Sequence, residues 1–436
     1  MTSPVLDCFQ TKALDELRSG FKFGSRAQLL VGPTGCGKTV KMGAIAASCV
    51  ALGGEVTALV HRGELRTQMR DVFARFGLDR IGFVAAGEPE DRGAPVQICM
   101  IQTLLSRSTD WLKPKLLLCD EAHHLAADEW RTTIERFGDI PRIGFTATPE
   151  RSDGRGLSGF ADRIVVSAQV SDLIASGRLV PCDVIAPHRP TKTLAWDPVD
   201  AWFEHAHGRK TVAFCTTVQE AKDLAAKFIE RGINAASVDG ETPTDEREQT
   251  IAAFKRGEIL VLTNCFVLTE GFDAPATEVC LLARGCSSPG TYLQMIGRVM
   301  RAAPGKDRAL VIDLRGAVHQ HGLPDDHREY SLDGNEPISG GTGPVRICKA
   351  CGFASPTGCR VCRNCAAEFP RISQLEMDRC DLVKISKGER ELNFFVEHLE
   401  IAKTRGYRAG WVAHRFQEKF GRFPRALWKE HVTEAA

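Results

Sequence analysis

The sequence lacks the excess of positive charge that marks a protein binding nucleic acid over its whole surface. Its 56 lysines and arginines are balanced by 55 aspartates and glutamates, and the formal net charge is +1. Any surface for nucleic acid must therefore be local, as on the wall of a groove.

Long apolar runs, repeats and a leader segment are also missing. No apolar stretch reaches the length of a transmembrane helix. We find no short-period repeat and no long low-complexity tract. The start of the chain, Met1-Thr2-Ser3-Pro4, has neither the charged nor the apolar region of a signal peptide, so we expect a cytoplasmic protein with no membrane partner.

What is present is typical of a globular protein of more than one domain. Hydrophobic residues make up 43% of the chain and charged residues 25%. A length of 436 residues predicts two or three domains.

Short apolar runs alternate with amphipathic segments up to about residue 315. A first series of candidate strands is followed by a second, with a pause near Pro187–Pro198. The first comprises Ala27–Val31, Val56–Val60, Val96–Ile101, Leu116–Asp120 and Arg142–Phe145. The second comprises Thr211–Cys215, Ala235–Val238, Ile259–Thr263, Glu278–Leu282 and Arg308–Asp313. This alternation predicts an α/β fold with two parallel-sheet lobes, residues 1–190 and 191–323.

The character of the chain changes at Pro324. Residues 324–344 are polar and turn-rich and predict a linker. A cysteine-rich module follows at 345–371, and we expect a helical tail at 372–436 with helices near Arg390–Thr404 and Ala409–Phe420. The tail mixes basic and aromatic residues, a pattern that favours packing of a helical pair and also allows stacking on bases.

Residues 32–39 have the form GxxxxGK[ST], a loop that cradles phosphates. The loop is Gly32, Pro33, Thr34, Gly35, Cys36, Gly37, Lys38 and Thr39. It follows an apolar strand and opens a helix, as the motif requires. The glycines let backbone N–H groups face phosphate oxygens, Lys38 places a charge on the β- and γ-phosphates, and Thr39 offers a hydroxyl to Mg²⁺.

Asp120-Glu121-Ala122-His123 stands at the end of the apolar run 116–119. Asp120 would hold Mg²⁺, and Glu121 would orient and deprotonate the attacking water. The alternative is a surface carboxylate pair that caps the next helix. His123 is a candidate for coupling this site to the other lobe. Thr146 and Thr148 could link the ATP site to a moving interface, or form a simple turn closed by Pro149.

Five of the 16 cysteines crowd into residues 348–365. Two CxxC pairs, Cys348/Cys351 and Cys362/Cys365, suit a tetrahedral Zn²⁺ in a zinc ribbon. Cys359 is a fifth thiol that can replace one of these ligands. An iron–sulfur cluster and loose redox thiols are the alternatives. The module has a basic excess, which fits either a phosphate-facing surface or a structural clip.

These motifs, in this order, resemble the superfamily 2 helicases with a DEAH box and a QxxGRxxR motif. The resemblance covers residues 5 to about 320. Within this superfamily, the chain is similar to the phage and mobile-element helicases that carry a C-terminal zinc ribbon. It implies two tandem RecA-like lobes with ATP and Mg²⁺ between them, and Zn²⁺ in the ribbon.

The resemblance also assigns roles to single residues. It implies that Gln10 reads adenine, although Asp7, Cys8 and Phe9 stand where the family often has an arginine and a proline-tyrosine pair. It implies that Asp273 holds the ribose of ATP. The nucleic-acid contacts it implies are Arg62, Thr103 and Thr263. The glycine-arginine motif supplies Gln294 for coupling and Arg298 and Arg301, three apart on one helix face, for the γ-phosphate.

The sequence thus predicts an ATP-dependent helicase or translocase. The family likeness points to single-stranded or branched DNA, in replication, recombination or repair, and to a motor that can act as a monomer. Two alternatives stay open. One is an ATP-gated clamp that holds or remodels DNA without unwinding it, and the other is an RNA helicase.

Overall fold

The computed structural model describes residues 4–61, 63–126, 128–149, 156–188, 190–269 and 272–333. Beyond these it describes residues 345–347, 354–356, 361, 367–368, 382–384, 387–405 and 409–424. The four preferred zinc ligands and Cys359 lie outside the described residues, so the structure does not test the predicted ribbon. Among the described helices, none is long and apolar enough to cross a membrane.

The first lobe is built on a seven-stranded sheet in the order β3-β4-β2-β5-β6-β1-β7. All of its neighbouring strands pair in parallel. The strands are β1 (Ala27–Val31), β2 (Val56–Val60), β3 (Ile81–Val84), β4 (Val96–Met100), β5 (Leu116–Cys119), β6 (Arg142–Thr146) and β7 (Arg163–Val166). The helices are α1 (Cys8–Lys22), α2 (Lys38–Ala51), α3 (Gly63–Ala74), α4 (Ile101–Ser106) and α5 (Asp128–Glu135), with a 3₁₀ turn, η1 (Ala122–Ala126).

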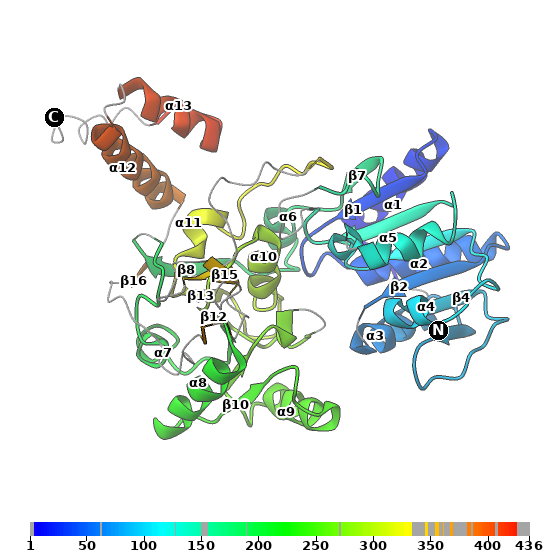
Figure 1. The fold of residues 1–436 in the computed structure, drawn as a ribbon, viewed down its shortest axis with the longest axis horizontal. Helices are drawn as coiled ribbons and strands as arrows, with labels where there is room; N and C mark the ends of the chain where they lie inside the picture. The colour runs from blue at the N-terminus through cyan, green and yellow to red at the C-terminus, as the bar shows by residue number, and fades with distance from the viewer. Residues whose placement is uncertain are drawn as a thin grey trace.

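The second lobe repeats this design, in the order β10-β11-β9-β12-β13-β8-β16. Its strands are β8 (Cys182–Pro187), β9 (Thr211–Cys215), β10 (Ala235–Val238), β11 (Val261–Asn264), β12 (Val279–Ala283), β13 (Ala309–Asp313) and β16 (Leu382–Lys384). Its helices are α6 (Val170–Ala175), α7 (Pro198–His205), α8 (Val218–Glu230), α9 (Thr244–Arg256), α10 (Pro289–Gly297) and α11 (Ala317–His321), with a 3₁₀ turn, η2 (Val267–Thr269). Figure 1 shows the two lobes side by side.

The two sheets confirm the predicted pair of parallel α/β lobes, but the predicted boundary at residue 190 is wrong. β8 pairs with β13 and is therefore the first strand of the second sheet, not the last strand of the first. The tail also contributes a strand, because β16 adds to β8 as an antiparallel edge. The described tail is therefore not wholly helical.

Each sheet is buried on both faces, which explains why its central strands read as continuous apolar runs. In the first lobe, Leu30 and Phe145 face the side of α1 and α2, whereas Leu29 and Leu117 face the side of α5. In the second lobe, α7 and α8 cover one face, where the indole of Trp202 donates to the Thr211 hydroxyl (2.6 Å). Helix α10 covers the other face with Tyr292 and Met295.

The segment after the second lobe returns to the first. The Gln169 side chain exchanges hydrogen bonds with the main chain of Arg328, and the Ser158 N–H donates to the Leu332 carbonyl. Tyr330 and Leu332 pack against the core of the first lobe. The described start of the predicted linker is therefore bound to the domains that it leaves.

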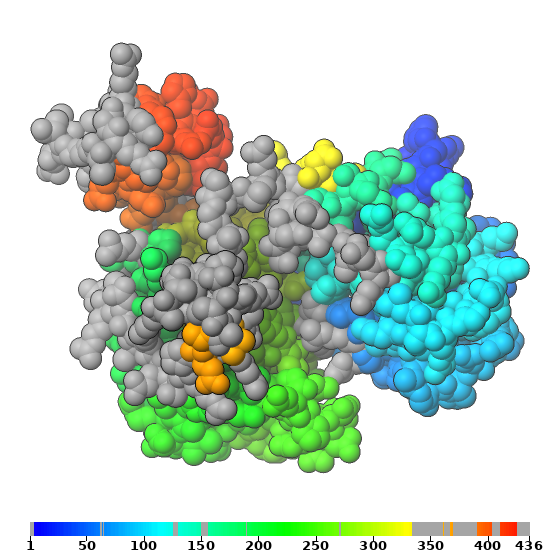
Figure 2. All heavy atoms as spheres, viewed as in Figure 1, coloured from blue at the N-terminus to red at the C-terminus, as the bar shows by residue number. Residues whose placement is uncertain are grey.

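Helices α12 (Lys387–Arg405) and α13 (Ala409–Phe420) form a hairpin at the second-lobe end of the molecule (Figure 2). Phe395 and Phe416 are buried between them, and Phe416 is completely enclosed. Arg390 pairs with Asp326, which ties α12 to the segment after α11. The aromatic residues of this hairpin mainly pack the helix pair, the simpler of the two sequence-based interpretations.

Candidate nucleotide site between the lobes

A cavity of about 780 Å³ lies between the two lobes. The first lobe lines it with the phosphate loop, α3 and the end of β5, and the second with α9 and the segments before β12 and after α10. Among its lining residues are Pro33, Thr34, Gly35, Gly37, Lys38, Thr39, Asp120, Glu121, Phe272, Asp273, Arg298 and Arg301. The cavity thus gathers most of the nucleotide residues predicted from sequence.

The loop between β1 and α2 has the shape of a phosphate cradle. Gly35 (φ 92°) and Gly37 (φ 75°) adopt left-handed backbone conformations that glycine alone adopts without strain. Gly37 caps α2 without any side-chain hydrogen bond, so the first N–H groups of this helix remain open to an anion. The Lys38 ammonium donates to the Gly32 carbonyl (3.3 Å), at the start of the same loop.

Gln10 lies against this loop but does not line the cavity. Its side-chain oxygen accepts from the Asp7 N–H (3.1 Å) in a capping box that starts α1. Its amide nitrogen packs so close to Gly37 that a Cβ there would overlap it. Gln10 is thus placed to support the cradle, while the predicted contact with adenine remains a prediction. The side chain of Cys36, within the loop, is buried.

The carboxylates of Asp120 and Glu121 stand at the end of β5. Asp120 is 6% exposed, and burial raises the pKa of its carboxyl to about 7; the charge of Glu121 adds to this rise and Lys38 opposes it. Glu121 has a left-handed backbone (φ 48°), which is uncommon for a residue with a side chain. The buried Asp120 carboxylate is a suitable oxygen donor for Mg²⁺, whose charge would favour its ionised form.

The arginines of the second lobe line the cavity, but their side chains have partners there. The Arg298 guanidinium donates to the carbonyls of Thr269 (3.0 and 2.5 Å) and Phe272 (2.8 Å). Arg301 forms an ion pair with Asp273. The predicted shared helix face is wrong, because α10 ends at Gly297 and Arg301 lies beyond it.

The two lobes touch through glycines of α10. A Cβ on Gly297 would lie 2.7 Å from the Thr34 Cβ of the phosphate loop. A Cβ on Gly290 would overlap the Thr148 hydroxyl. An added Cβ at Gly297 meets a Cβ of the phosphate loop rather than the end of a flexible side chain, so Gly297 sets how closely α10 approaches this loop.

A chain of contacts joins the carboxylate end of the site to this interface. His123 Nδ1 lies 3.4 Å from a Glu121 carboxylate oxygen and 3.3 Å from the Thr146 hydroxyl. The Thr146 hydroxyl donates to the Thr148 carbonyl (2.6 Å), and Thr148 meets α10. The structure therefore brings together three of the four residues predicted to couple the lobes. The fourth, Gln294, is buried within α10.

The residues predicted to contact nucleic acid are less well placed. Thr263 is completely buried, and its hydroxyl donates to the carbonyls of Ala221 (2.7 Å) and Ala236 (3.3 Å), so the prediction that it meets a phosphate is wrong for this structure. Thr103 is 8% exposed within α4. Arg62 lies outside the described residues.

Two cations of the cavity carried no sequence signal. Arg178, in the loop after α6, forms an ion pair with Asp7 (2.5 Å), and Lys255 reaches the cavity from the last turn of α9. Neither belongs to a motif, and only the folded chain brings them near the phosphate loop.

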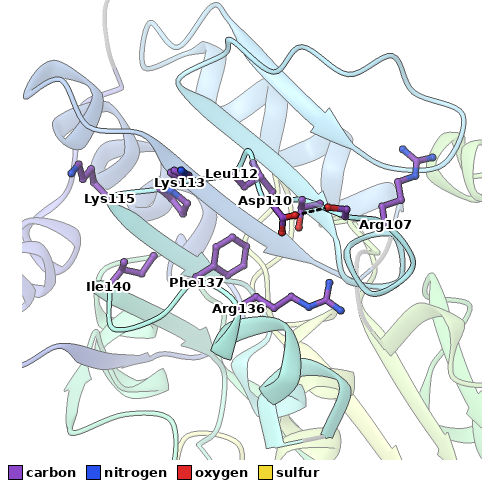
Figure 3. A pocket seen from close by; sticks show the side chains of 11 residues that line it. Arg107, Asp110, Leu112, Lys113, Lys115, Arg136, Phe137 and Ile140 are labelled. Carbon is purple, nitrogen blue, oxygen red and sulfur yellow. Dashed lines mark hydrogen bonds between the residues drawn. The ribbon is translucent and has the colours of Figure 1, made fainter.

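A second cavity, of about 810 Å³, lies within the first lobe and shares no residue with the first (Figure 3). Its rim carries Arg107, Lys113, Lys115 and Arg136. Arg107 pairs with Glu90 (3.2 Å), and Arg136 donates to the Leu104 carbonyl (2.7 Å). These arginines already have partners, and the cavity contains no phosphate loop.

Comparison with known proteins agrees with this geometry. Residues 4–151 match the family "Type III restriction enzyme, res subunit", and residues 195–303 match "Helicase conserved C-terminal domain". A 51.5 kDa protein of a Lactococcus phage is 30% identical over 368 residues, which cover 78% of each chain. The protein irc3 of Schizosaccharomyces pombe, named provisionally as a mitochondrial ATP-dependent helicase, is 30% identical over 76% of this chain and 60% of its own. The "DNA 3'-5' translocase XPB2" of Sulfurisphaera tokodaii is 23% identical over 66% of this chain and 77% of its own.

Solved structures share the fold. The type ISP restriction-modification enzyme LlaBIII, solved bound to DNA, aligns with 72% of this chain and 28% of its own (TM-score 0.56, 17% identity). The helicase Lhr of Mycobacterium smegmatis, solved with single-stranded DNA and AMP-PNP, aligns with 75% of this chain and 51% of its own (TM-score 0.52, 17% identity). Saccharomyces cerevisiae Dbp5, solved with RNA, aligns with 74% of this chain and 93% of its own (TM-score 0.53, 17% identity).

The two domain matches follow one another along the chain in the order of the two lobes, and the phage relative spans both. By its sequence and its paired sheets, the chain belongs to the superfamily 2 helicases, the ATP-dependent motors of nucleic acid.

Proposed function

We propose that this chain is a DEAH-type helicase or translocase that hydrolyses ATP between its lobes and moves along DNA. The observation that carries the proposal is the cavity in which the phosphate loop and Asp120-Glu121 face Asp273, Arg298 and Arg301 of the other lobe. A site divided in this way can only be completed by both lobes, so nucleotide binding and lobe position are coupled.

Each residue of the first lobe has one task in this reaction. The open N–H groups of the loop and of α2 bind the phosphates, and Lys38 leaves the Gly32 carbonyl to contact the β- and γ-phosphates. Thr39 and Asp120 would hold Mg²⁺, which would offset the charge of the phosphates. Glu121 orients the attacking water and accepts its proton. Its left-handed backbone fixes the direction of the carboxylate.

In the second lobe, we assign the two arginines different tasks. Arg298 fixes the main chain at Thr269 and at Phe272 through its contacts with their carbonyls. Arg301 exchanges its ion pair with Asp273 for the γ-phosphate, while the freed carboxylate accepts from the ribose hydroxyls. The exchange gains contacts only when nucleotide is bound, which makes closure depend on ATP.

The contacts from Glu121 through His123, Thr146 and Thr148 to Gly290 give a route by which hydrolysis changes the lobe interface. Loss of the γ-phosphate removes the partner of Arg301 and alters the surroundings of Glu121. Both changes loosen the contact between the phosphate loop and α10, and repeated closing and opening steps the lobes along one strand.

DNA is the proposed nucleic-acid substrate because XPB2 is named a DNA 3'-5' translocase, and LlaBIII and Lhr were solved with DNA. Dbp5 was solved with RNA, which keeps an RNA helicase as the alternative. A DNA clamp that uses ATP without unwinding is the second alternative. The chain matches 60% of irc3, so the activity of such larger relatives is not transferred as a whole.

The cysteine module is proposed to bind one Zn²⁺ through Cys348, Cys351, Cys362 and Cys365. The support is the spacing of the two CxxC pairs. Elemental analysis should find one zinc per chain, and iron absorbance or a metal-free protein would contradict the assignment.

One comparison of ATPase rates tests the proposal. Single-stranded DNA, duplex DNA and RNA oligonucleotides of equal length are each added to the same protein, and a strand-displacement assay runs in parallel. We expect the largest stimulation with single-stranded DNA and displacement of a DNA strand. Stimulation by RNA alone would favour the RNA helicase, and stimulation by DNA without displacement would favour the clamp.

A further inference from the structure

Two guanidinium groups stand at the carboxyl-terminal edge of the second sheet, away from the nucleotide cavity. Arg284 directly follows β12, and Arg315 lies two residues after β13, the neighbouring strand (Figure 1). The carboxyl ends of parallel strands meet at one edge, which is where α/β sheets bind their ligands. Neither residue lines the nucleotide cavity or belongs to a motif identified in the sequence.

Each of the two groups has a buried donor nitrogen without a hydrogen-bond partner. Arg284 is 8% exposed, and its Nη1 is buried without a hydrogen-bond partner. Its Nε donates to the Gly285 carbonyl (3.2 Å). Nε of Arg315 is likewise buried without a partner. A buried guanidinium with an unused N–H is unfavourable unless a ligand satisfies it.

No described carboxylate forms a salt bridge with either group. Glu220 is the acidic residue whose charge acts on Arg315, but its carboxylate accepts from the N–H groups of Thr216 (2.9 Å) and Thr217 (3.3 Å) at the start of α8. Burial lowers the pKa of both arginines, and the charge of Arg315 lowers the pKa of Arg284 further. An anion between them would remove both penalties.

Two further groups at this edge suit a nucleic-acid strand. The Thr216 hydroxyl, directly after β9, is buried without a partner and adds a third donor. Phe266, after β11, lies over Arg284 with its ring centre 3.8 Å from the guanidinium carbon and is 48% exposed. Its left-handed backbone (φ 62°) is unusual for a bulky residue and holds the ring at the surface. An exposed ring beside a cationic pocket is the arrangement that stacks a base next to a bound phosphate.

We infer that Arg284 and Arg315, with the Thr216 hydroxyl, form a binding site for a backbone phosphate of single-stranded DNA on the second lobe, and that Phe266 stacks the adjoining base. The inference rests on the proposed function and gives the second lobe the strand contact that buried Thr263 does not provide. Because a planar guanidinium can donate twice to one phosphate, arginine suits this position better than lysine.

The test compares binding of a fluorescent oligo(dT) by anisotropy over a range of salt concentrations, with a non-hydrolysable ATP analogue present. The variants are Arg284→Met, Arg315→Met and Phe266→Ala. The matched control is Arg308→Met, which removes an exposed arginine paired with Asp183 (2.8 Å) at the other end of β13. ATPase without nucleic acid and thermal melting are measured for each protein.

We expect each methionine variant at 284 and 315 to bind oligo(dT) about tenfold more weakly and to lower the salt slope by about 0.7. Phe266→Ala should weaken binding without changing the slope, because it removes no charge. The control should bind like the parent chain, and ATPase without nucleic acid should be the same in all of them. Arg284→Lys, which keeps the charge and loses the fork, should weaken binding and keep the slope.

The melting temperature separates a ligand site from a structural role. A phosphate site predicts that Arg284→Met melts no lower than the control, because the unused buried charge is removed. Normal affinity and slope in both arginine variants would overturn the inference while leaving the proposed motor intact, as would weak binding that follows only from a lower melting temperature. A parent chain that binds RNA but not oligo(dT) would move the site to RNA, and one that binds neither overturns both the site and the motor.

Discussion

The two lobes share a strand order, yet they prepare their halves of the nucleotide site in different ways. In the first lobe, short stretches directly after β1 and β5 supply the glycine loop and the carboxylates. In the second lobe, Arg298 is bound to the main chain and Arg301 to Asp273. The first half is formed before nucleotide arrives, whereas the second must exchange a contact.

The largest effects are expected when the charged side chains of the first-lobe half of the nucleotide site are removed. Lys38→Ala and Glu121→Gln should each lower ATP turnover by about 100-fold or more, and Glu121→Gln should still bind ATP because only the proton acceptor is lost. A steady-state ATPase assay with a fluorescent nucleotide titration measures both effects. Lys12→Ala and Glu135→Gln, exposed residues of the same lobe, serve as controls and should change neither. Normal turnover in Glu121→Gln would refute its role as the base.

The second-lobe half of the nucleotide site, which must exchange a contact when ATP binds, is tested by substituting Arg301. Arg301→Ala should reduce turnover by about 100-fold, because a donor for the developing phosphoryl charge is lost. Its melting temperature should stay close to that of the parent chain, since the pair with Asp273 is partly exposed and such pairs contribute little stability. Turnover and melting are measured on one preparation. Full activity in this variant would mean that the second lobe contributes no charge to catalysis.

The contact between the halves is tested with a single methyl group. Gly297→Ala places a Cβ 2.7 Å from the Thr34 Cβ, so α10 must move back from the phosphate loop. We expect turnover to fall about tenfold, because small misplacements of catalytic groups are costly. Gly240→Ala, where an added Cβ meets open space, is the control. Equal rates for the two variants would show that closure does not require this approach.

Arg298 and Arg301 are further separated by their effects on stability. Arg298→Met should lower the free energy of unfolding of the second lobe by about 2–4 kcal/mol, because the carbonyls of Thr269 and Phe272 lose a charged donor. Urea denaturation followed by fluorescence measures this loss. If Arg298→Met is as stable as Arg301→Ala, the structural task assigned to Arg298 is wrong.

The same contrast explains what could be predicted from sequence. β1, β2, β9 and β10 appear with the predicted bounds, because each is a short apolar run closed by turn residues. The phosphate loop was predictable because its chemistry lies within eight consecutive residues. β8 was assigned to the wrong lobe, because its partner β13 lies more than a hundred residues away.

The contacts of individual side chains were even harder to predict from the sequence. Arg298, Arg284 and Lys255 acquire their surroundings from segments that only folding brings together, and no local pattern encodes those contacts. Most of the residues that the sequence assigned to the nucleotide line the cavity, but the sequence could not show that the arginines have other partners there.

Substitution of Thr263 has the smallest predicted effect. It decides between the phosphate contact that the family resemblance implies and the buried hydrogen bond that the structure shows. Thr263→Val keeps the shape of the side chain and removes the hydroxyl that donates to the Ala221 carbonyl. We expect a loss of about 1 kcal/mol in the free energy of unfolding and unchanged affinity for single-stranded DNA. Thr263→Ser, which retains the hydroxyl, should preserve more of that hydrogen bond. A variant that folds with full stability but binds DNA more weakly would return Thr263 to the phosphate contact that the sequence implied, and would require β11 to move when DNA binds.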